Sequence, residues 1–520
     1  MSNLNAPAIS SRYSRYVIFL IIFVFLILNI LNLKDLSLID WDEGAFALQA
    51  KWLASSFAEG KPFNFQTPPL FQIIIALLFR LLSFRDWILL LVSMLSSALT
   101  IFIVFKLAKM LDTTETGIYS VLLLVFTEFF LFFSKSGLSD ATFTFFFISA
   151  MYFFYQGIKS NQNRQFIFAG LFCLLALYTK YSAPALLIIL FIVGFINCRK
   201  MNAKWFLFTI VLPIILYLPY LAVFLKIVSV RSIGERHLTL LGMNHFKFLY
   251  YLFVFAPIPL VLSVSYAIIA IVKKKWTQQY KYVNVGVTGN DANQSWGIGF
   301  VVIPVIIFFI IVGFYHPYFR LAYPMVPLLS IIGAQLLKPL GKLKHYTLVF
   351  LMVISFILGW KTIAYCTDIP KQIAKLETKY VELNHSGYIL TTVPPNVLFY
   401  LNGHICFLVK DSFIRLGTRY PELLNKRIIL NPERNRLVNQ DQVLLIHCTI
   451  FDSIKTKYKD LFATGILIDT LEFMDAPVYY KDIFNPLRDQ RQIYELYVFF
   501  NNFNRLWQLG SEPIVEIISP

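Results

Sequence analysis

A succession of long apolar runs separated by short polar loops is the feature that most restricts what this chain can fold into. The first run extends from Val17 to Leu33, and similar runs follow as far as residue 364. Lipid offers no partner to backbone polar groups, so such runs cross a bilayer as helices that satisfy their own hydrogen bonds. Hydrophobic residues make up 58% of the chain and charged residues 14%. The sequence therefore predicts a polytopic α-helical membrane protein with about 11 to 13 transmembrane helices.

The positions of the basic residues predict the orientation of these helices. Lys and Arg outnumber Asp and Glu by 46 to 29, and they gather in the loops around residues 106–109, 159–164, 199–204, 273–281 and 338–344. The positive-inside rule places these loops in the cytoplasm and explains the excess charge without nucleic acid as a partner. This parity requires the short run from Phe71 to Leu82, which carries Arg80, to lie along the outer membrane surface. The N-terminus is then cytoplasmic. We expect Gly117 to Phe133 and Lys247 to Val272 each to form one span.

The chain changes character after residue 364. Short apolar runs alternate there with turn signals, and a helical pattern covers Lys371 to Leu383. The expected strands are Tyr388–Val393, Val397–Leu401, Cys406–Val409, Arg427–Leu430, Val443–His447 and Ile466–Ile468. We predict a transmembrane domain over 1–364, with external juxtamembrane helices at about 43–83, and a soluble extracytoplasmic α/β domain over 365–520.

An acidic stretch in the first external loop is the first candidate for chemistry. Asp40, Asp42 and Glu43 lie within four positions, just before the helical pattern from Glu43 to Phe57. In one interpretation Asp42 and Glu43 only stabilise the helix N-terminus. In the other they are functional carboxylates on the outer face. Asp140, which opens a later span, has the same two interpretations, as a cap or as a second carboxylate able to bind a metal ion or act as a base.

Glu128 lies within an apolar run and is either a functional acid or a structural, paired one.

Cations and aromatic residues accompany these acids at the predicted external ends of the spans. The cations are suited to a phosphate group, although span-end cations also serve as membrane anchors; they are Lys180, Arg231, Arg236, His237 and Arg320. The aromatic residues could stack on sugar faces or belong to an interfacial belt; they are Trp41, Tyr181, Tyr318 and Tyr323.

A set of short motifs in a fixed order resembles the GT-C glycosyltransferases. The motifs are Trp41-Asp42-Glu43-Gly44-Ala45-Phe46, Pro68-Pro69-Leu70, Asp140, Thr179-Lys180, Glu235-Arg236-His237 and Arg320-Leu321-Ala322-Tyr323-Pro324. More narrowly, the first 340 residues or so look like the bacterial branch related to protein O-mannosyltransferases and to the lipid A aminoarabinose transferase.

This resemblance implies a function and a place in the cell. It implies transfer of a sugar from a polyprenyl-phosphate donor to an acceptor lipid, glycan or protein on the outer face of the bacterial inner membrane. Asp42 matches the base or acceptor-positioning residue, with Glu43 beside it and Asp140 as the second acid. Lys180 and Arg320 match the residues expected to hold the lipid phosphate. The Glu-Arg-His stretch, with Arg236 and His237, matches a loop that closes over the donor.

The sequence also departs from the family pattern. Ala45 stands where many relatives have an arginine, and Gln66-Thr67 stand where they have Glu-Lys. These changes leave the metal and cofactor question open, because a divalent metal is compatible with the acids but not required by them. Two other classes stay as alternatives. One is a secondary transporter, for which Glu128 would be the intramembrane charge, and the other is a non-catalytic lipid-binding or assembly factor.

Overall fold

The computed structural model describes most of the membrane region and the strands of the C-terminal part. The described residues are 11–30, 33, 38, 41–56, 67–197, 202–227, 244–272, 298–315, 318–358, 388–391, 399, 405–408, 428–429, 442–448, 459, 463, 466–474 and 491–500. The chain divides into two compact units. The first contains residues 1–33, 67–71 and 90–363, and the second contains 34–66, 72–89 and 364–520.

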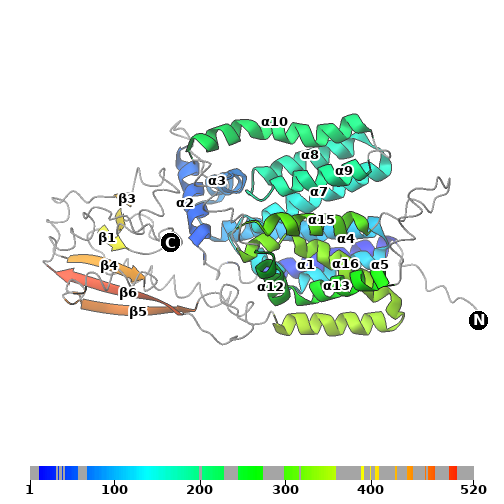
Figure 1. The fold of residues 1–520 in the computed structure, drawn as a ribbon. Helices are drawn as coiled ribbons and strands as arrows, with labels where there is room; N and C mark the ends of the chain where they lie inside the picture. The colour runs from blue at the N-terminus through cyan, green and yellow to red at the C-terminus, as the bar shows by residue number, and fades with distance from the viewer. Residues whose placement is uncertain are drawn as a thin grey trace, which may run out of the picture. The chain divides into compact units, whose positions relative to one another are not determined.

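The first unit is a helical bundle (Figure 1). Its helices are α1 (Ser11–Ile30), α4 (Trp87–Leu111, from residue 90), α5 (Thr114–Val125), α6 (Glu128–Ser134), α7 (Asp140–Ser160), α8 (Asn163–Leu177), α9 (Pro184–Ile196), α10 (Ala203–Ile227), α12 (His245–Phe255), α13 (Pro257–Val272), α15 (Gly299–Val312), η5 (Phe319–Ala322), α16 (Met325–Leu337), η6 (Lys338–Leu340) and a last helix, Leu343–Leu358. Among the described residues, four helices are long and apolar enough to cross a membrane, or up to six if two bent pairs each count as one. The total of 11 to 13 stays a prediction.

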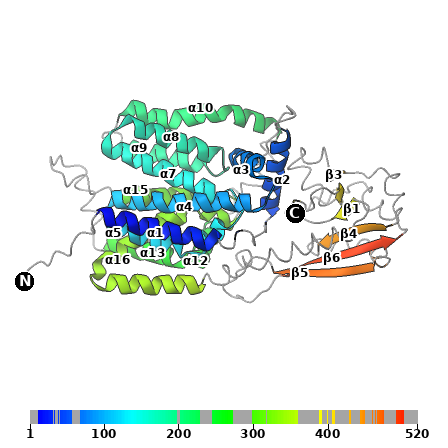
Figure 2. The same ribbon diagram turned by 180° about the vertical axis from the view of Figure 1, so that it is seen from behind.

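The exposure of the side chains shows which helices lie at the centre of this bundle and which lie at its periphery. Every residue of α16 from Met325 to Gln335 is buried, and this helix packs against α5, α13 and α15. By contrast, α1 and α10 expose large apolar side chains such as Phe23 and Ile215. An outer surface of this kind suits lipid, since apolar groups exposed there lose nothing by facing acyl chains. Figure 2 shows the same bundle from behind, with α1 in front of it.

Two of the expected spans, Gly117–Phe133 and Lys247–Val272, are each a pair of helices with a sharp bend between them, and whether each pair crosses the membrane as one span stays a prediction. The pair α5 and α6 bends by 70°, and the pair α12 and α13 by 115°. Pro257 accounts for the second break, because the residue before a proline avoids helical backbone and Ala256 has φ −139 and ψ 49. At the first break Thr127 is extended, and its hydroxyl donates to the Leu123 carbonyl at 2.7 Å.

The first break changes the position of Glu128. Instead of lying inside a continuous span, Glu128 is the first residue of α6 and is buried. A carboxylate in the first turn of a helix is stabilised by the helix dipole. The location is compatible with the structural interpretation of this acid, and its role stays a prediction.

Close packing at Gly117 leads to a stability prediction. A Cβ atom at Gly117 would lie 2.8 Å from Cδ2 of Phe105 and 3.0 Å from its backbone oxygen, so α4 and α5 would have to separate. We expect Gly117→Ala to destabilise the purified protein by about 1–3 kcal/mol, as overpacking does, seen as a lower thermal midpoint. Gly299→Ala is the matched control, since a Cβ there meets nothing within 4 Å. An unchanged midpoint for Gly117→Ala would contradict the close approach.

The second unit contains two helices from the predicted juxtamembrane region. These are α2 (Trp41–Ser56) and most of α3 (Leu70–Leu82). The buried amide of Gln72 donates to Gln49 Oε1 at 3.1 Å, which joins α3 to α2. Phe79 of α3 stacks on Phe399, with ring centroids 6.1 Å apart, and contacts Phe84 edge to face. Buried polar and aromatic side chains of α3 thus pack against α2 and Phe399 within this unit.

The second unit also contains a mixed sheet of six strands. The strands are β1 (Tyr388–Thr391), β2 (Ile405–Leu408), β3 (Ile428–Ile429), β4 (Gln442–Cys448), β5 (Ile466–Met474) and β6 (Arg491–Phe500), in the spatial order β3-β2-β1-β4-β6-β5. The pairs β1–β2, β2–β3 and β1–β4 are parallel, and β6 is antiparallel to β4 and β5. Parallel pairs require crossover connections. The α/β assignment stays a prediction, because the connections between the parallel strands lie outside the described residues.

One strand of this sheet was not expected, and two expected elements lie largely or wholly outside the described residues. Strand β6 was not among the expected strands, although its residues Ile493 to Phe499 are mostly β-branched, aromatic or aliphatic. The expected strand Val397–Leu401 lies outside the described residues except for Phe399, whose backbone is helical. The expected helix Lys371–Leu383 also lies outside them.

Candidate functional site

A buried ion pair joins two of the residues selected from the sequence. Asp140 is the first residue of α7, and Lys180 lies in the turn between α8 and α9. The Asp140 carboxylate pairs with the Lys180 ammonium, and their side chains are 3% and 11% exposed. Neither group is a simple surface anchor or cap, since burying either charge alone would cost several kcal/mol by an order-of-magnitude estimate. The structure therefore brings together two motifs that are forty positions apart in the sequence.

The turn that carries Lys180 is held by hydrogen bonds from three directions. The Leu70 amide donates to the Tyr178 carbonyl at 2.8 Å, the Thr179 hydroxyl donates to the Leu175 carbonyl at 2.6 Å, and the Tyr178 hydroxyl donates to the Leu216 carbonyl at 2.8 Å. The bond from Leu70 fixes the Pro-Pro-Leu motif against the Thr-Lys motif.

This contact between the Pro-Pro-Leu and Thr-Lys motifs has a local cause. Pro68 and Pro69 are buried and have no backbone N–H, and Leu70 is the first residue of α3. The first N–H groups of a helix have no partner inside the helix, so the Leu70 amide is available to another segment. Sequence reasoning noted both motifs but had no signal that they meet.

The loop before Asp140 is anchored to α4. The Ser93 hydroxyl donates to the Leu138 carbonyl at 3.1 Å, and Ser96 and Thr142 share a hydrogen bond of 3.0 Å. These bonds fix the start of α7 and with it the Asp140 carboxylate. Lys135, in the same loop, is only 8% exposed. Lys135 was not among the candidates selected from the sequence, and a buried lysine in the loop that leads to Asp140 is a further candidate for the site.

Arg320 lies in η5, a short helix held by aromatic packing. The guanidinium lies 5.6 Å from the centroid of the Tyr318 ring, an arrangement that fixes the orientation of a cation. Phe319 contacts Phe133 of α6 and Phe255 of α12, with centroids 6.0 and 5.7 Å apart. Arg320 is half-buried and is therefore presented from a rigid turn.

The remaining aromatic candidates differ in their surroundings. Tyr323 is 1% exposed, and its ring centroid lies 4.5 Å from that of Phe133. This is core packing, and we therefore leave Tyr323 out of the sugar contacts proposed below. Tyr181 packs against Phe224 at 5.4 Å, and Tyr318 is 40% exposed. Tyr318 is thus far more exposed than Tyr323, although Arg320 lies over its ring.

The acids of the first predicted external loop belong to the second unit. Asp42 and Glu43 both lie in the first turn of α2, which begins at Trp41. Glu43 is 1% exposed and Asp42 is half-buried. The position agrees with the helix-stabilising interpretation, and it also leaves part of Asp42 accessible. Of the two acids, only Asp42 is exposed enough to meet a substrate without movement of the chain.

Several candidates lie outside the described residues. They are Asp40, Arg231, Arg236 and His237. Within the described part of the chain, no group of three His, Cys, Asp or Glu residues is arranged to hold a metal ion.

An apolar hollow of ≈ 470 Å³ lies in the angle between α12 and α13. Its lining includes Phe246, Leu249, Phe253 and Val261, residues with exposed side chains. Phe246, Leu249 and Phe253 lie on the face of α12 away from buried Phe248, Leu252 and Phe255, and Val261 belongs to α13. The hollow is therefore open to lipid and suited to a hydrocarbon chain.

Comparison with known proteins identifies the fold. Residues 66–223 match a family model described as dolichyl-phosphate-mannose-protein mannosyltransferase. The structure of ArnT from Cupriavidus metallidurans bound to undecaprenyl phosphate is similar with a TM-score of 0.64 at 13% identity, over 95% of this chain and 99% of that one. Its apo state gives 0.64 at 14% identity, over 97% and 100%. The oligosaccharyltransferase AglB from Archaeoglobus fulgidus, in complex with an inhibitory peptide and a dolichol-phosphate, gives 0.50 at 11% identity, over 87% and 70%. No curated protein matches the sequence.

The helical bundle and these matches define a class. The chain is a multi-pass membrane protein with the fold of ArnT. The resemblance to the GT-C glycosyltransferase superfamily, on the branch related to the lipid A aminoarabinose transferase and the O-mannosyltransferases, is confirmed.

Proposed function

We propose that this protein is a membrane glycosyltransferase that moves a sugar from a polyprenyl-phosphate donor to an acceptor on the extracytoplasmic face. The observation that carries the proposal is the buried pair of Asp140 and Lys180, built from two separate motifs of the GT-C pattern. The solved relatives add support, because one is bound to undecaprenyl phosphate and another is in complex with a dolichol-phosphate. The acceptor class, whether lipid, glycan or protein, is left open by the proposal.

The chemistry assigns a role to each candidate. The bond between the anomeric carbon and the phosphate oxygen breaks, and the acceptor oxygen bonds to the anomeric carbon. The acceptor proton passes to a carboxylate, for which we propose Asp42 as the general base with Glu43 as its neighbour. The leaving polyprenyl phosphate carries the released negative charge. Cations held in a fixed geometry stabilise that charge as it develops.

Lys180 is suited to this second role because of its partner. Its ammonium has three N–H donors, and the Asp140 carboxylate holds it in position. We propose that this ammonium, held in place by Asp140, also contacts an oxygen of the donor phosphate. Arg320 offers a planar group with five N–H donors, suited to two phosphate oxygens at once. We propose the same phosphate-binding role for Arg236 and His237, and sugar stacking for Trp41, Tyr181 and Tyr318.

A donor-consumption assay tests the proposal. The purified full-length protein is incubated with a series of polyprenyl-phosphate sugars and a membrane extract containing acceptors. We expect release of polyprenyl phosphate together with a labelled acceptor that mass spectrometry can identify. Transport of a solute into vesicles without donor consumption would favour the secondary transporter, and donor binding without turnover would favour the non-catalytic lipid-binding factor.

The proposed orientation has its own test. We propose a bacterial inner-membrane location with the N-terminus in the cytoplasm and residues 365–520 outside, because the Lys/Arg-rich loops then face inward. In a variant without native cysteines, Ser232→Cys should react with a membrane-impermeant thiol reagent in intact cells, and Gln162→Cys should react only after lysis. Position 232 lies outside the described residues, whereas Gln162 is exposed between α7 and α8. The reverse labelling pattern would overturn the orientation.

A further inference from the structure

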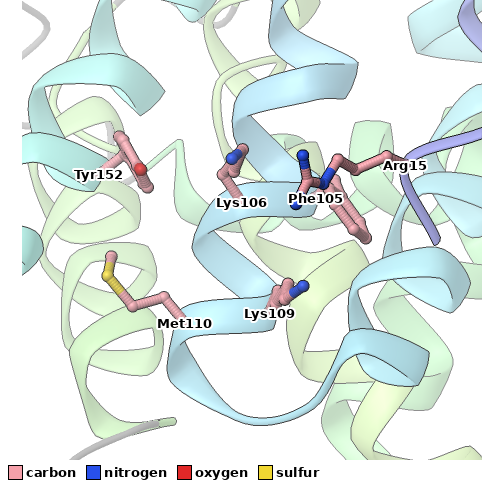
Figure 3. A pocket seen from close by; sticks show the side chains of 6 residues that line it. All are labelled: Arg15, Phe105, Lys106, Lys109, Met110 and Tyr152. Atoms are coloured by element: carbon pink, nitrogen blue, oxygen red, sulfur yellow. The ribbon is translucent and has the colours of Figure 1, made fainter. Parts of the chain in front are cut away.

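A second hollow in the first unit has a different character from the apolar one. It has a volume of ≈ 530 Å³ and is lined by residues of α1, α4 and α7, namely Arg15, Phe105, Lys106, Lys109, Met110 and Tyr152 (Figure 3). Three of its six lining residues are cations. The hollow lies at the C-terminal end of α4, near the loops rich in Lys and Arg. The proposed transfer site does not use any of these residues.

Two other lysines near this end are paired with acids, and a third contacts a backbone carbonyl. Lys338 pairs with Asp112, and Lys344 pairs with Glu115 at 2.5 Å. The ammonium of Lys159 donates to the Met110 carbonyl at 3.3 Å. In the part of the chain that the structure describes, the acids at the junction of α4 and α5 are thus committed to cations outside the hollow.

The three cations of the hollow have no acidic partner among the described residues. Lys106 and Lys109 instead lie over the rings of Phe102 and Phe105, at 5.3 and 5.9 Å from the centroids. Figure 3 shows the Arg15 side chain reaching from α1 past Phe105 toward α4. Three like charges around one hollow repel one another, and that repulsion is relieved when an anion enters.

The surroundings of the hollow indicate what kind of anion fits it. Phe105 and Met110 provide apolar lining beside the cations. The outer face of α1, one turn and more beyond Arg15, exposes Phe19, Leu20 and Phe23 by 59%, 61% and 60%. A ligand with a charged head and hydrocarbon chains can use both features, whereas a small free anion can use only the first. Basic pockets between transmembrane helices on the cytoplasmic side are suited to acidic lipid head groups.

We propose that this hollow binds the phosphodiester head group of an anionic phospholipid, with its acyl chains along the outer face of α1. Arg15, Lys106 and Lys109 contact the phosphate, and the Tyr152 hydroxyl is available to the rest of the head group. The negative charge of the bound lipid would offset part of the repulsion among the three cations, and its contacts would tie α1 to α4. This proposal is independent of the proposed transferase function, because it uses none of the same residues.

Native mass spectrometry of the full-length protein with phosphatidylglycerol and phosphatidylcholine tests this site. The wild type should retain phosphatidylglycerol in preference to phosphatidylcholine, and inorganic phosphate at equal concentration should not displace it. The triple variant R15Q/K106Q/K109Q should retain phosphatidylglycerol at least about tenfold less well, since a basic residue near an anionic surface contributes about fivefold. The matched control R164Q/K204Q/K342Q removes three exposed cations elsewhere and should change retention by less than about twofold, because none of its positions lines the hollow.

Three results would overturn the proposal: equal loss in the control, unchanged retention in the triple variant, or displacement of the lipid by inorganic phosphate. The last would show a site for a small free anion. If the triple variant is not monodisperse, the single variant R15Q, at an exposed position of α1, replaces it with an expected loss of about fivefold. The conservative variant K106R/K109R should keep the preference for phosphatidylglycerol.

Discussion

Replacing Asp42 by asparagine lowers the rate of sugar transfer from a polyprenyl-phosphate donor by about 10²–10⁴-fold, the usual contribution of a general base. Asparagine has nearly the same shape and still fits the first turn of α2, where Asp42 is half-buried. It lacks the negative charge that accepts the acceptor proton. The measurement is the initial rate of polyprenyl phosphate release by purified wild-type and variant protein at matched folded concentration.

A stability effect cannot account for a loss of that size. If Asp42 only stabilises the start of α2, its charge is worth about 0.3–1 kcal/mol through the helix dipole. That amount shifts the thermal midpoint slightly and leaves the rate per folded molecule unchanged. The two interpretations of the acidic stretch therefore differ in the measured rate rather than in the structure.

Asp86 provides a matched control for this change. Its carboxylate accepts a hydrogen bond of 2.8 Å from the Trp87 amide at the start of α4, so it too is an acid at a helix N-terminus. Asp86→Asn keeps a capping side chain and should leave the rate of transfer unchanged. Full activity in Asp42→Asn, or equal loss in Asp86→Asn, would refute the role of Asp42 as the base.

The helices could be predicted from the sequence because their cause is local. An apolar run of twenty or so residues has few ways to satisfy its backbone in lipid, and the expected first run, Val17 to Leu33, overlaps α1 (Ser11–Ile30). The breaks were harder to predict. Pro257 lies inside an apolar run, and proline occurs within membrane helices that stay continuous, as Pro213 and Pro219 do in α10. Whether a proline breaks its helix or leaves it continuous depends on the packing around that proline.

The candidate site was predictable in composition but not in contacts. Charge parity placed Asp140 and Lys180 on one side of the membrane, and the structure joins them directly. Nothing local indicates that the Leu70 amide meets the Tyr178 carbonyl, because that bond depends on how α3 begins relative to α8. Tyr323 shows the opposite case. The motif that contains Tyr323 contributed to the family resemblance, but the sequence could not show that the Tyr323 ring is enclosed by Phe129, Phe130 and Phe133.

The second large effect is expected at the ion pair of Asp140 and Lys180. Asp140→Asn alone removes the carboxylate that pairs with the Lys180 ammonium, and breaking a buried pair in this way costs about 3–5 kcal/mol. The double variant D140N/K180Q removes both charges and should recover most of the lost stability. A double-mutant cycle on the thermal midpoint therefore measures the coupling between the two groups.

The rate of sugar transfer distinguishes an ion pair that only stabilises the fold from one whose lysine also binds the donor phosphate. If Lys180 stabilises the leaving phosphate, the stable double variant D140N/K180Q should still transfer sugar at least about a hundredfold more slowly than the wild type, as the loss of one preorganised donor does elsewhere. The control is D112N/K338Q, which removes the ion pair of Asp112 and Lys338; these side chains are 24% and 37% exposed, and neither belongs to the proposed site. We expect that control to lose at most about 1 kcal/mol of stability, the value of an exposed pair, and to keep its rate. Recovery of both stability and full transfer rate in D140N/K180Q would show that the pair only supports the fold, and the phosphate would then have to be assigned to Arg320 and the other cations.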